Sequence, residues 1–225
     1  NLNKYNLKDL NEYGFEKNPK EVPNFDVSKK IIEEYENKRN FPSLNSTSKI
    51  GPFLRFGVIS IRSLVKYVLK FNNDTFLNEL IWREFFMQIL FHFPNSSTSS
   101  FKSKYDNIKW ANDKKMFEAW KKGKTGFPIV DAGMNELNKT GFMHNRVRMI
   151  TSSFLCKQLL IDWRWGEKYF ALKLNDYEMS SNVGNWQWAS GSGVDAAPYF
   201  RIFNPHTQIE KFDKNYDYIN NWIDL

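Results

Sequence analysis

The chain has 225 residues, of which 41% are hydrophobic and 17% aromatic, and its formal net charge is +7. One cysteine excludes a disulfide framework, and the three histidines lack the spacing of metal ligands. No apolar run approaches the roughly 20 residues that span a membrane, so we expect an intracellular, cytoplasmic protein that holds no metal. The basic excess favours a nucleic-acid partner, although a Lys- and Asn-rich composition alone explains it equally well.

The first part of the chain is predicted to be an irregular lead-in over residues 1–28. Helix signals begin at Asp26, with apolar residues on one helical face, and stop at Pro42. Ser, Thr, Gly and Pro predict a loop over residues 43–57, and a second helix follows over residues 58–71.

A third segment starts at Asp74 as its cap, ends before Pro94 and is apolar nearly all round, which predicts a buried central helix. A polar loop is expected over residues 95–109. It is followed by a short amphipathic helix over residues 111–123.

The helix signals continue to the end of the domain. Pro128 in a first turn and Gly141 as a stop bound one helix. Residues 144–166 are expected to form one long helix, with a further helix over residues 167–174. The glycines within residues 182–205 argue against a helix there.

Long helical stretches with almost no strand pattern predict an all-α fold, a single multi-helix globular domain over residues 29–225. Two apparent nucleotide-binding motifs lack the sequence context that such motifs need. The Gly-rich match at Gly191 follows no strand. The "GKT" at Gly123 has Glu118 where a phosphate loop needs glycine.

Polar groups on two helical faces are candidates for a site. Glu79, Trp82 and Arg83 share one helical face. They would line a polar cavity, because burying such groups is otherwise costly. The alternative is a buried salt bridge between Glu79 and Arg83, with Trp82 packed in the core. The second face, in "MHNRVRM", carries Asn145 and Met149 with arginines beside them. It suits a planar ligand with polar edges and, equally, an ordinary helix start.

Two further segments carry polar groups. The hydroxyls and backbone N–H groups around Thr47, Ser48 and Gly51 have the form of a phosphate cradle, a weak signal on its own. Asp176 and Glu178 precede Asn182 and could accept from the hydroxyls of a ligand.

Taken together, the stretch from Tyr35 to Trp222 resembles the flavin-binding helical domain of the DNA photolyase and cryptochrome family. The matching segments occur in the family's order: "YENKRNFP", "TSKIGPFLRFG", "ELIWREFF", "KTGFPIVDAGMNELNKTGFMHNRVRMITSSFL", "DWRWGEKYF" and "NWQWASGSGVDAAPYFRIFNP". "MHNRVRM" resembles the branch that repairs cyclobutane pyrimidine dimers.

The resemblance implies non-covalent FAD in a central cavity of the helices, active when fully reduced. Asn182 would face flavin N5 and Arg148 would pair with Asp176. The implied cofactor-binding residues are Tyr35, Thr47, Ser48, Lys49, Ile50, Gly51, Arg83, Arg148, Asp176, Tyr177, Glu178 and Asn182.

The resemblance also implies a substrate pocket for a flipped-out dimer, with Trp82 and Trp188 as aromatic walls and Glu79 donating a hydrogen bond to the dimer. The matching substrate-facing residues are Glu79, Trp82, Asn145, Met149 and Trp188. The implied electron-transfer chain is Trp110, Trp163 and Trp186, and the implied contacts to the DNA backbone are Arg39, Arg146 and Gln208.

The implied activity is light-driven repair of damaged DNA by a monomeric photolyase, associated with the nucleoid if the source is bacterial. The family's N-terminal α/β antenna domain is not in this sequence, so we expect no antenna chromophore here. Two alternatives stand beside this reading. One is a cryptochrome-type blue-light sensor without repair activity, and the other is a flavin-free nucleic-acid-binding module.

Overall fold

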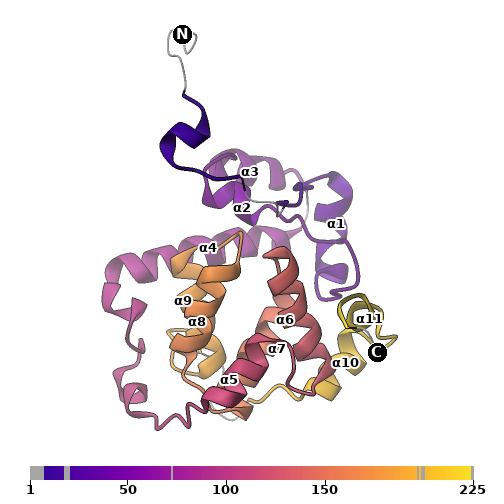
Figure 1. Ribbon diagram of the computed structural model, residues 1–225. Helices are drawn as coiled ribbons and strands as arrows, with labels where there is room; N and C mark the ends of the chain where they lie inside the picture. Colours follow the sequence, from indigo (N-terminus) through magenta and orange to yellow (C-terminus); the bar gives the residue numbers. More distant parts are fainter. Residues whose placement is uncertain (1–7, 18–20, 72, 197, 199–200, 224–225) are drawn as a thin grey trace.

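The computed structural model describes residues 8–17, 21–71, 73–196, 198 and 201–223. Within these residues it contains helices and turns and no β-strand, in agreement with the all-α prediction. Part of the expected lead-in, residues 1–7 and 18–20, lies outside the described residues. The α-helices of the described part (Figure 1) are α1 Lys29–Lys38, α2 Gly51–Arg55, α3 Ile61–Val68, α4 Asp74–His92, α5 Lys114–Lys121, α6 Pro128–Thr140, α7 Asn145–Ser153, α8 Trp163–Lys173, α9 Met179–Ser190, α10 Pro205–Phe212 and α11 Asp217–Trp222.

The buried apolar side chains form two clusters. The smaller cluster, which includes Ile32 and Phe76, comes from α1 to α4 and the loop before α2. The larger one, which includes Trp120 and Trp186, comes from α5 to α11. Helix α4 packs against α1 and α3 on one side and α9 on the other, and it lies between the two groups of helices in Figure 1. It therefore joins the two clusters.

The start of α4 is tied to α1 by one side chain. The Asn73 Oδ1 atom accepts from the backbone N–H of Phe76 at 3.1 Å, and its Nδ2 donates to the carbonyl of Ile32 at 2.6 Å. Asn73, and not Asp74 as expected, is therefore the N-cap of α4. This double role fixes α1 against α4 and brings residues of both helices to one site.

Two segments predicted as loops contain helical turns. Helix α2 lies within residues 43–57, because Pro52 in its first turn presets a helical φ. The polar loop predicted over residues 95–109 has 3-10 turns at Pro94–Ser97 and Ser103–Asn107.

The long helix predicted over residues 144–166 is wrong, because the chain breaks in its middle. Helix α7 passes into a π-helical turn at Phe154–Gln158, and Leu160 then adopts a left-handed φ of 51°. Asp162 caps a new helix, α8, by accepting from the backbone N–H of Arg164 at 3.0 Å. The predicted helix over residues 167–174 is thus a continuation of the helix that begins at Trp163.

Helix α4 is not the buried central helix that its apolar sequence predicts. Its fully buried side chains lie on one face, while Ile81, Trp82 and Phe91 are 56%, 42% and 77% exposed. Packing against α1, α3 and α9 covers only part of its surface. The exposed side leaves Trp82 available to a cavity.

Helix α9 contradicts the expectation that its glycines would prevent a helix. Gly184 lies inside it, and Gly191, with a φ of 92°, caps its end. A Cβ on Gly184 would lie 2.2 Å from Cδ1 of Phe86. The glycine is therefore the place where α4 and α9 approach closely, and only the fold reveals this contact.

Replacing Gly184 with alanine is expected to lower the free energy of unfolding by about 1–3 kcal/mol through overpacking. This loss outweighs the gain in helix propensity of up to about 1 kcal/mol. Urea unfolding followed by circular dichroism measures the effect. In a Phe86→Ala background the ring that the new methyl group would meet is gone, so the same substitution should cost less there. An equal cost in both backgrounds would contradict the close contact.

Candidate functional site

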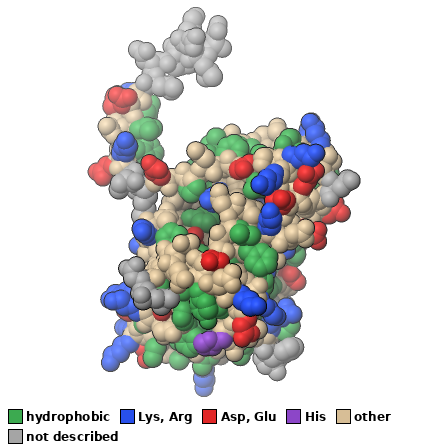
Figure 2. All heavy atoms as spheres, turned by 90° about the vertical axis from the view of Figure 1, so that its right-hand side faces the viewer, with side chains coloured by type: hydrophobic (Ala, Val, Ile, Leu, Met, Phe, Trp, Pro, Cys, Tyr) green, Lys and Arg blue, Asp and Glu red, His purple; other side chains and the backbone are tan. Residues whose placement is uncertain are grey.

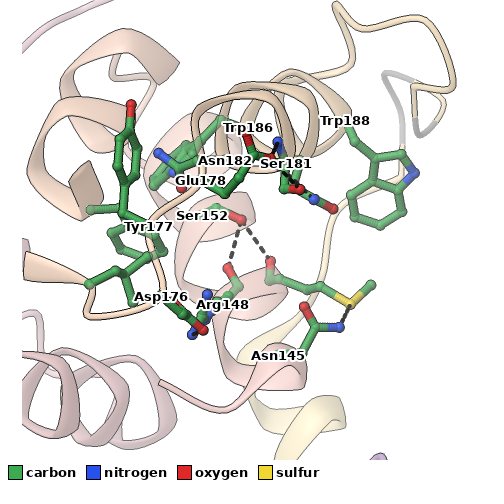
Figure 3. A pocket seen from close by; sticks show the side chains of 14 residues that line it. Asn145, Arg148, Ser152, Asp176, Tyr177, Glu178, Ser181, Asn182, Trp186 and Trp188 are labelled. Carbon is green, nitrogen blue, oxygen red and sulfur yellow. Dashed lines mark hydrogen bonds and ion pairs between the residues drawn. The ribbon is translucent and has the colours of Figure 1, made fainter. Parts of the chain in front are cut away.

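A deep cavity of about 90 Å³ lies between α7, α8 and α9. In the view of Figure 3, Tyr177 and Trp188 lie at opposite ends of it. Both polar and aromatic side chains face this cavity. They include Asn145, Arg148, Asp176, Tyr177, Asn182 and Trp186.

The expected ion pair between Arg148 and Asp176 is present on one side of the deep cavity. The Arg148 Nη2 atom lies 2.8 Å from Asp176 Oδ2, and its Nε donates to the carbonyl of Met143 at 2.7 Å. The second carboxylate oxygen, Asp176 Oδ1, is buried and has no hydrogen-bond partner among the described residues. A buried acceptor left open in a cavity fits a ligand that carries a donor.

The segment predicted as a phosphate cradle is divided between two places. A Cβ on Gly51 would lie 3.0 Å from Cβ of Asp176, so the start of α2 packs closely against Asp176, which lines the deep cavity. Thr47 and Lys49 instead line a separate cavity that also contacts His144. Of the remaining cradle residues, Ile50 is buried in the smaller apolar cluster together with the half-buried Tyr35, and Ser48 is also buried.

Glu178 lines the deep cavity but works as the N-cap of α9. Its two oxygens accept from the backbone N–H and the hydroxyl of both Ser180 and Ser181. These hydrogen bonds lower the pKa of Glu178 although burial opposes them. Three of these four hydrogen bonds reach Oε2 and one reaches Oε1. The cofactor-binding role expected of Glu178 from the sequence stays a prediction.

An outer cavity of about 250 Å³ adjoins the deep one, and Asn145, Met149 and Trp188 line both. Helix α4 supplies its opposite wall. All five residues expected to face a substrate line it, together with Arg83: Glu79, Trp82, Arg83, Asn145, Met149 and Trp188. Of the two tryptophans predicted as aromatic walls, Trp188 lines both cavities and Trp82 lines the outer one.

Glu79 forms an ion pair with Arg39, the C-cap residue of α1, and does not pair with Arg83 among the described residues. The predicted alternative of a Glu79–Arg83 salt bridge is therefore wrong. The Arg39 guanidinium also lies 5.7 Å from the ring centre of Tyr35. The Glu79 carboxylate, which the resemblance expects to face the dimer, therefore has the Arg39 guanidinium as its direct neighbour.

A basic groove continues from Met149 and Trp188 along α10. Arg146, one of its residues, donates to Asn40 Oδ1 at 2.5 Å and lies over the Phe212 ring. The groove contains two of the three predicted DNA-backbone residues and two cations that the sequence analysis missed. It is lined by Arg146, Arg201, Asn204, Gln208, Lys211 and Phe212.

Elsewhere the charges are mixed. On the face that carries α1, α10 and α11, Lys and Arg side chains alternate with acidic ones (Figure 2). The excess of cations therefore does not form one continuous patch on this face. The basic groove beside the outer cavity is a better candidate for a nucleic-acid contact.

The three tryptophans expected to carry electrons lie in or against one apolar cluster. Trp186 and Trp163 are buried in it, and Trp110 packs on its edge. Trp186 also lines the deep cavity. The indole of Trp120, which the sequence analysis did not single out, lies 6.1 Å from Trp186 between ring centres.

The buried His144 imidazole should make stability depend on pH. Its pKa is lowered to about 4, first because burial disfavours the charged ring and then because Arg148 and Arg146 lie nearby. The unfolded chain therefore takes up the proton more readily, and stability present above pH 6.5 is lost as the pH falls toward 4. We expect a loss on the order of 3 kcal/mol over this range.

Urea unfolding at pH 7 and pH 5 tests this expectation. The control is His144→Asn, because asparagine keeps an acceptor for the backbone N–H of Arg146, which His144 Nδ1 accepts at 3.2 Å. The variant should lose less stability on acidification than the wild type. Identical pH dependence in both proteins would exclude His144 as the cause.

The described residues lack two kinds of feature. In that part of the chain, none of the helices combines the length and hydropathy of a membrane span. Nor do three or more His, Cys, Asp or Glu side chains of these residues gather where they could hold a metal ion.

Fold and cavities together define a helical domain in which a cavity lined by polar and aromatic side chains adjoins an outer cavity lined by two tryptophans, beside a basic groove. The family profile described as "FAD binding domain of DNA photolyase" matches residues 76–225. The chain belongs to this family.

Relatives are found among both sequences and structures. A deoxyribodipyrimidine photo-lyase of Alkalihalophilus pseudofirmus is 47% identical over 201 residues, which is 87% of this chain and 42% of the relative. A class III photolyase of Agrobacterium tumefaciens matches with a TM-score of 0.81 and 46% identity, over 85% of this chain and 41% of that one. A Synechocystis cryptochrome matches with a TM-score of 0.78 and 39% identity, over 85% and 41%. The chain thus spans about two fifths of the length of these relatives.

Proposed function

We propose that this chain is the flavin- and DNA-binding part of a light-driven enzyme that repairs cyclobutane pyrimidine dimers. The observation that carries the proposal is the joining of the deep cavity to an outer cavity walled by Trp82 and Trp188. The names of the photo-lyase relatives, at 42–47% identity, support the same activity.

FAD fits the deep cavity because the residues present match its chemistry. Asp176 Oδ1 is a buried acceptor without a partner, and Arg148 holds the other carboxylate oxygen of the same residue. Asn182 and Tyr177 add hydrogen-bonding groups, and Trp186 adds an aromatic wall. When bound and reduced, FAD supplies a light-excited electron donor, while the protein supplies binding and orientation.

The outer cavity would hold the damaged bases outside the duplex. Extrusion costs least where stacking and pairing are already impaired, as in a dimer. Trp82 and Trp188 would stack on the bases, and Asn145 would donate to a base edge. Arg146, Gln208 and the further cations of the basic groove would contact the flanking phosphates. Arg39 would reach the backbone only by leaving Glu79.

We propose that the chain acts as a monomer. Residues 29–225 would form one domain. Its proposed substrate is chromosomal DNA, which places its action in the cytoplasm, at the nucleoid if the source is bacterial. We propose non-covalent FAD, active when fully reduced, with neither a metal nor an antenna pigment among these residues.

The test is repair under light. The purified chain, loaded with FAD and reduced, is mixed with an oligonucleotide that contains one thymine dimer and exposed to blue or near-UV light. Recovery of absorbance near the thymine maximum in the light and not in the dark is the expected result. A loaded, reduced protein that binds the oligonucleotide and leaves the dimer intact would refute repair.

A second candidate is a blue-light sensor without repair activity. It is favoured by the similarity to the Synechocystis cryptochrome. The repair assay separates the two, because a sensor would change its flavin spectrum in light and leave the dimer intact. A folded chain that binds DNA and never binds flavin would instead support the flavin-free module.

Trp110 offers a prediction on the electron path. We expect Trp110→Phe to slow the photoreduction of oxidised flavin and to leave repair by pre-reduced protein unchanged. Trp222→Phe is the control, because Trp222 also packs on the edge of the large cluster and lies outside the proposed path. Absorbance changes after a light pulse measure the first effect. Loss of repair by the pre-reduced Trp110→Phe protein would contradict the path.

A further inference from the structure

A separate cavity of about 280 Å³, which we call the α11 cavity, lies apart from the proposed flavin and DNA sites. It is formed by the loop between α1 and α2, the end of α6 with the turn that follows it, and helix α11. None of its lining residues also lines the deep cavity, the outer cavity or the basic groove. Its volume is close to the lower limit of known ligand pockets, roughly 300 Å³, so it suits a small ligand.

His144, which lines the α11 cavity, carries a buried donor without a partner. The side chain is 4% exposed, and its Nδ1 atom accepts from the backbone N–H of Arg146 at 3.2 Å. A neutral imidazole whose Nδ1 accepts carries its proton on Nε2. This Nε2 atom is buried and has no hydrogen-bond partner among the described residues. Such a donor fits a ligand that carries an acceptor.

Glu136 supplies the opposite kind of group to the same cavity. Its side chain is 7% exposed, and its Oε2 atom accepts from the Tyr218 hydroxyl at 2.6 Å and from the backbone N–H of His144 at 3.3 Å. The second oxygen, Oε1, accepts no hydrogen bond within the described part of the chain. Burial raises the pKa of Glu136, because the charged form is poorly solvated there. A cationic donor on a ligand would stabilise the carboxylate.

A cation and an apolar wall complete the α11 cavity. Lys49 lines it and adopts a left-handed φ of 50°, which is uncommon for a residue other than glycine. Lys49 and Glu136 form no ion pair with each other among the residues that the structure describes. Leu44, Phe142 and Trp222 add apolar surface. One cation and one anion that are not paired with each other, beside an apolar wall, fit a ligand that carries both charges.

We propose that the α11 cavity binds a free α-amino acid with an apolar or aromatic side chain. The ammonium group of the ligand would donate to Glu136 Oε1, and its carboxylate would accept from His144 Nε2 and pair with Lys49. An α-amino acid carries both charges on one carbon atom, and the hydrogen bond between Glu136 and His144 holds the matching residues side by side. The ligand side chain would pack on Leu44 and Phe142. FAD has no ammonium group, so this ligand class differs from the proposed cofactor.

The first test is an NMR titration of the flavin-free chain with L-phenylalanine and with L-leucine. We expect one ligand to bind per chain. Phenethylamine lacks the carboxylate of L-phenylalanine, and 3-phenylpropanoate lacks its ammonium group. Each analogue should bind about tenfold more weakly, the value of one hydrogen bond to a charged group. If neither amino acid binds, or if both analogues bind as tightly as L-phenylalanine, the proposal is overturned.

Two variants assign the two charges of the ligand to their partners. Glu136→Gln keeps an acceptor for the Tyr218 hydroxyl and removes the negative charge. It should weaken L-phenylalanine binding about tenfold and leave 3-phenylpropanoate unaffected. Lys49→Gly removes the cation, and glycine tolerates the left-handed backbone. It should weaken L-phenylalanine and leave phenethylamine unaffected. Lys168→Ala, which removes an exposed cation of α8, is the control and should change nothing. Equal losses for all ligands in both variants would contradict the assignment.

The same titration locates the ligand in the molecule. The signal of the His144 Nε2–H proton should shift on addition of L-phenylalanine, because this proton gains an acceptor. Asn182→Ala changes the deep cavity and not the α11 cavity, so it should leave the affinity unchanged. A shift of the Trp186 indole N–H signal without one at His144, together with a loss of affinity in Asn182→Ala, would place the ligand in the deep cavity and overturn the proposal.

Discussion

Trp82→Ala is expected to weaken the binding of dimer-containing DNA by about 1–3 kcal/mol, roughly 5- to 150-fold, the contribution of one base–aromatic stack. Trp82 lines the outer cavity opposite Trp188 and is 42% exposed although it lies on an apolar helix. Its ring stacks on Phe86 at 5.9 Å between centres, which fixes the position of the wall. Fluorescence anisotropy with an oligonucleotide containing one thymine dimer measures the affinity.

The same titration with undamaged DNA separates recognition of the lesion from contact with the backbone. Trp82→Ala should leave that affinity nearly unchanged, whereas Lys211→Ala, in the basic groove, should weaken binding of both DNAs and reduce the salt dependence. Phe91→Ala is the control on the same helix, because Phe91 is 77% exposed. If Trp82→Ala and Phe91→Ala bind the damaged DNA equally well, Trp82 is not a wall of the substrate pocket.

Arg148→Ala is expected to weaken FAD binding by about 2 kcal/mol, or roughly 30-fold, because it leaves the Asp176 carboxylate without its cation. The expected loss of binding free energy is smaller than for a fully buried ion pair, because the Arg148 and Asp176 side chains are 24% and 15% exposed. Arg148→Lys should restore only part of the affinity, since an ammonium cannot copy the fork that reaches both Asp176 and the Met143 carbonyl.

The matched control is Arg164→Ala. This arginine also pairs with carboxylates, those of Asp106 and Asp162, and is 29% exposed, but it does not line the deep cavity. Flavin content after gel filtration and a fluorescence titration with FAD measure the two effects. Equal retention of flavin by the two alanine variants would mean that Arg148 does not hold the cofactor site.

Local signals predicted helix ends well where one residue decides them. Pro128 in the first turn and Gly141 at a φ of 75° bound α6 as expected. The break between α7 and α8 escaped prediction because Asp162 looks like an ordinary polar residue in a helical pattern until its role as a cap is seen. The helical Gly184 was misread because its neighbour, Phe86, is almost a hundred positions away.

The candidate site, like the helix ends, could be predicted only in part from the sequence. The family resemblance named the substrate-facing residues as a set. All of them line the outer cavity. Spacing along one helix suggested Arg83 as the partner of Glu79, but the partner is Arg39, which the tie between α1 and α4 brings close. The hydrogen bond from Asn182 to Glu167 gave no signal in the sequence, because it joins two helices, α8 and α9, that pack together.

The most direct test of a flavin cavity is the visible absorption spectrum of the purified chain after incubation with excess FAD and gel filtration. We predict flavin bands that elute with the protein at close to one FAD per chain, and a markedly lower content in Arg148→Ala. A chain that is folded and helical by circular dichroism and retains no flavin would contradict the account.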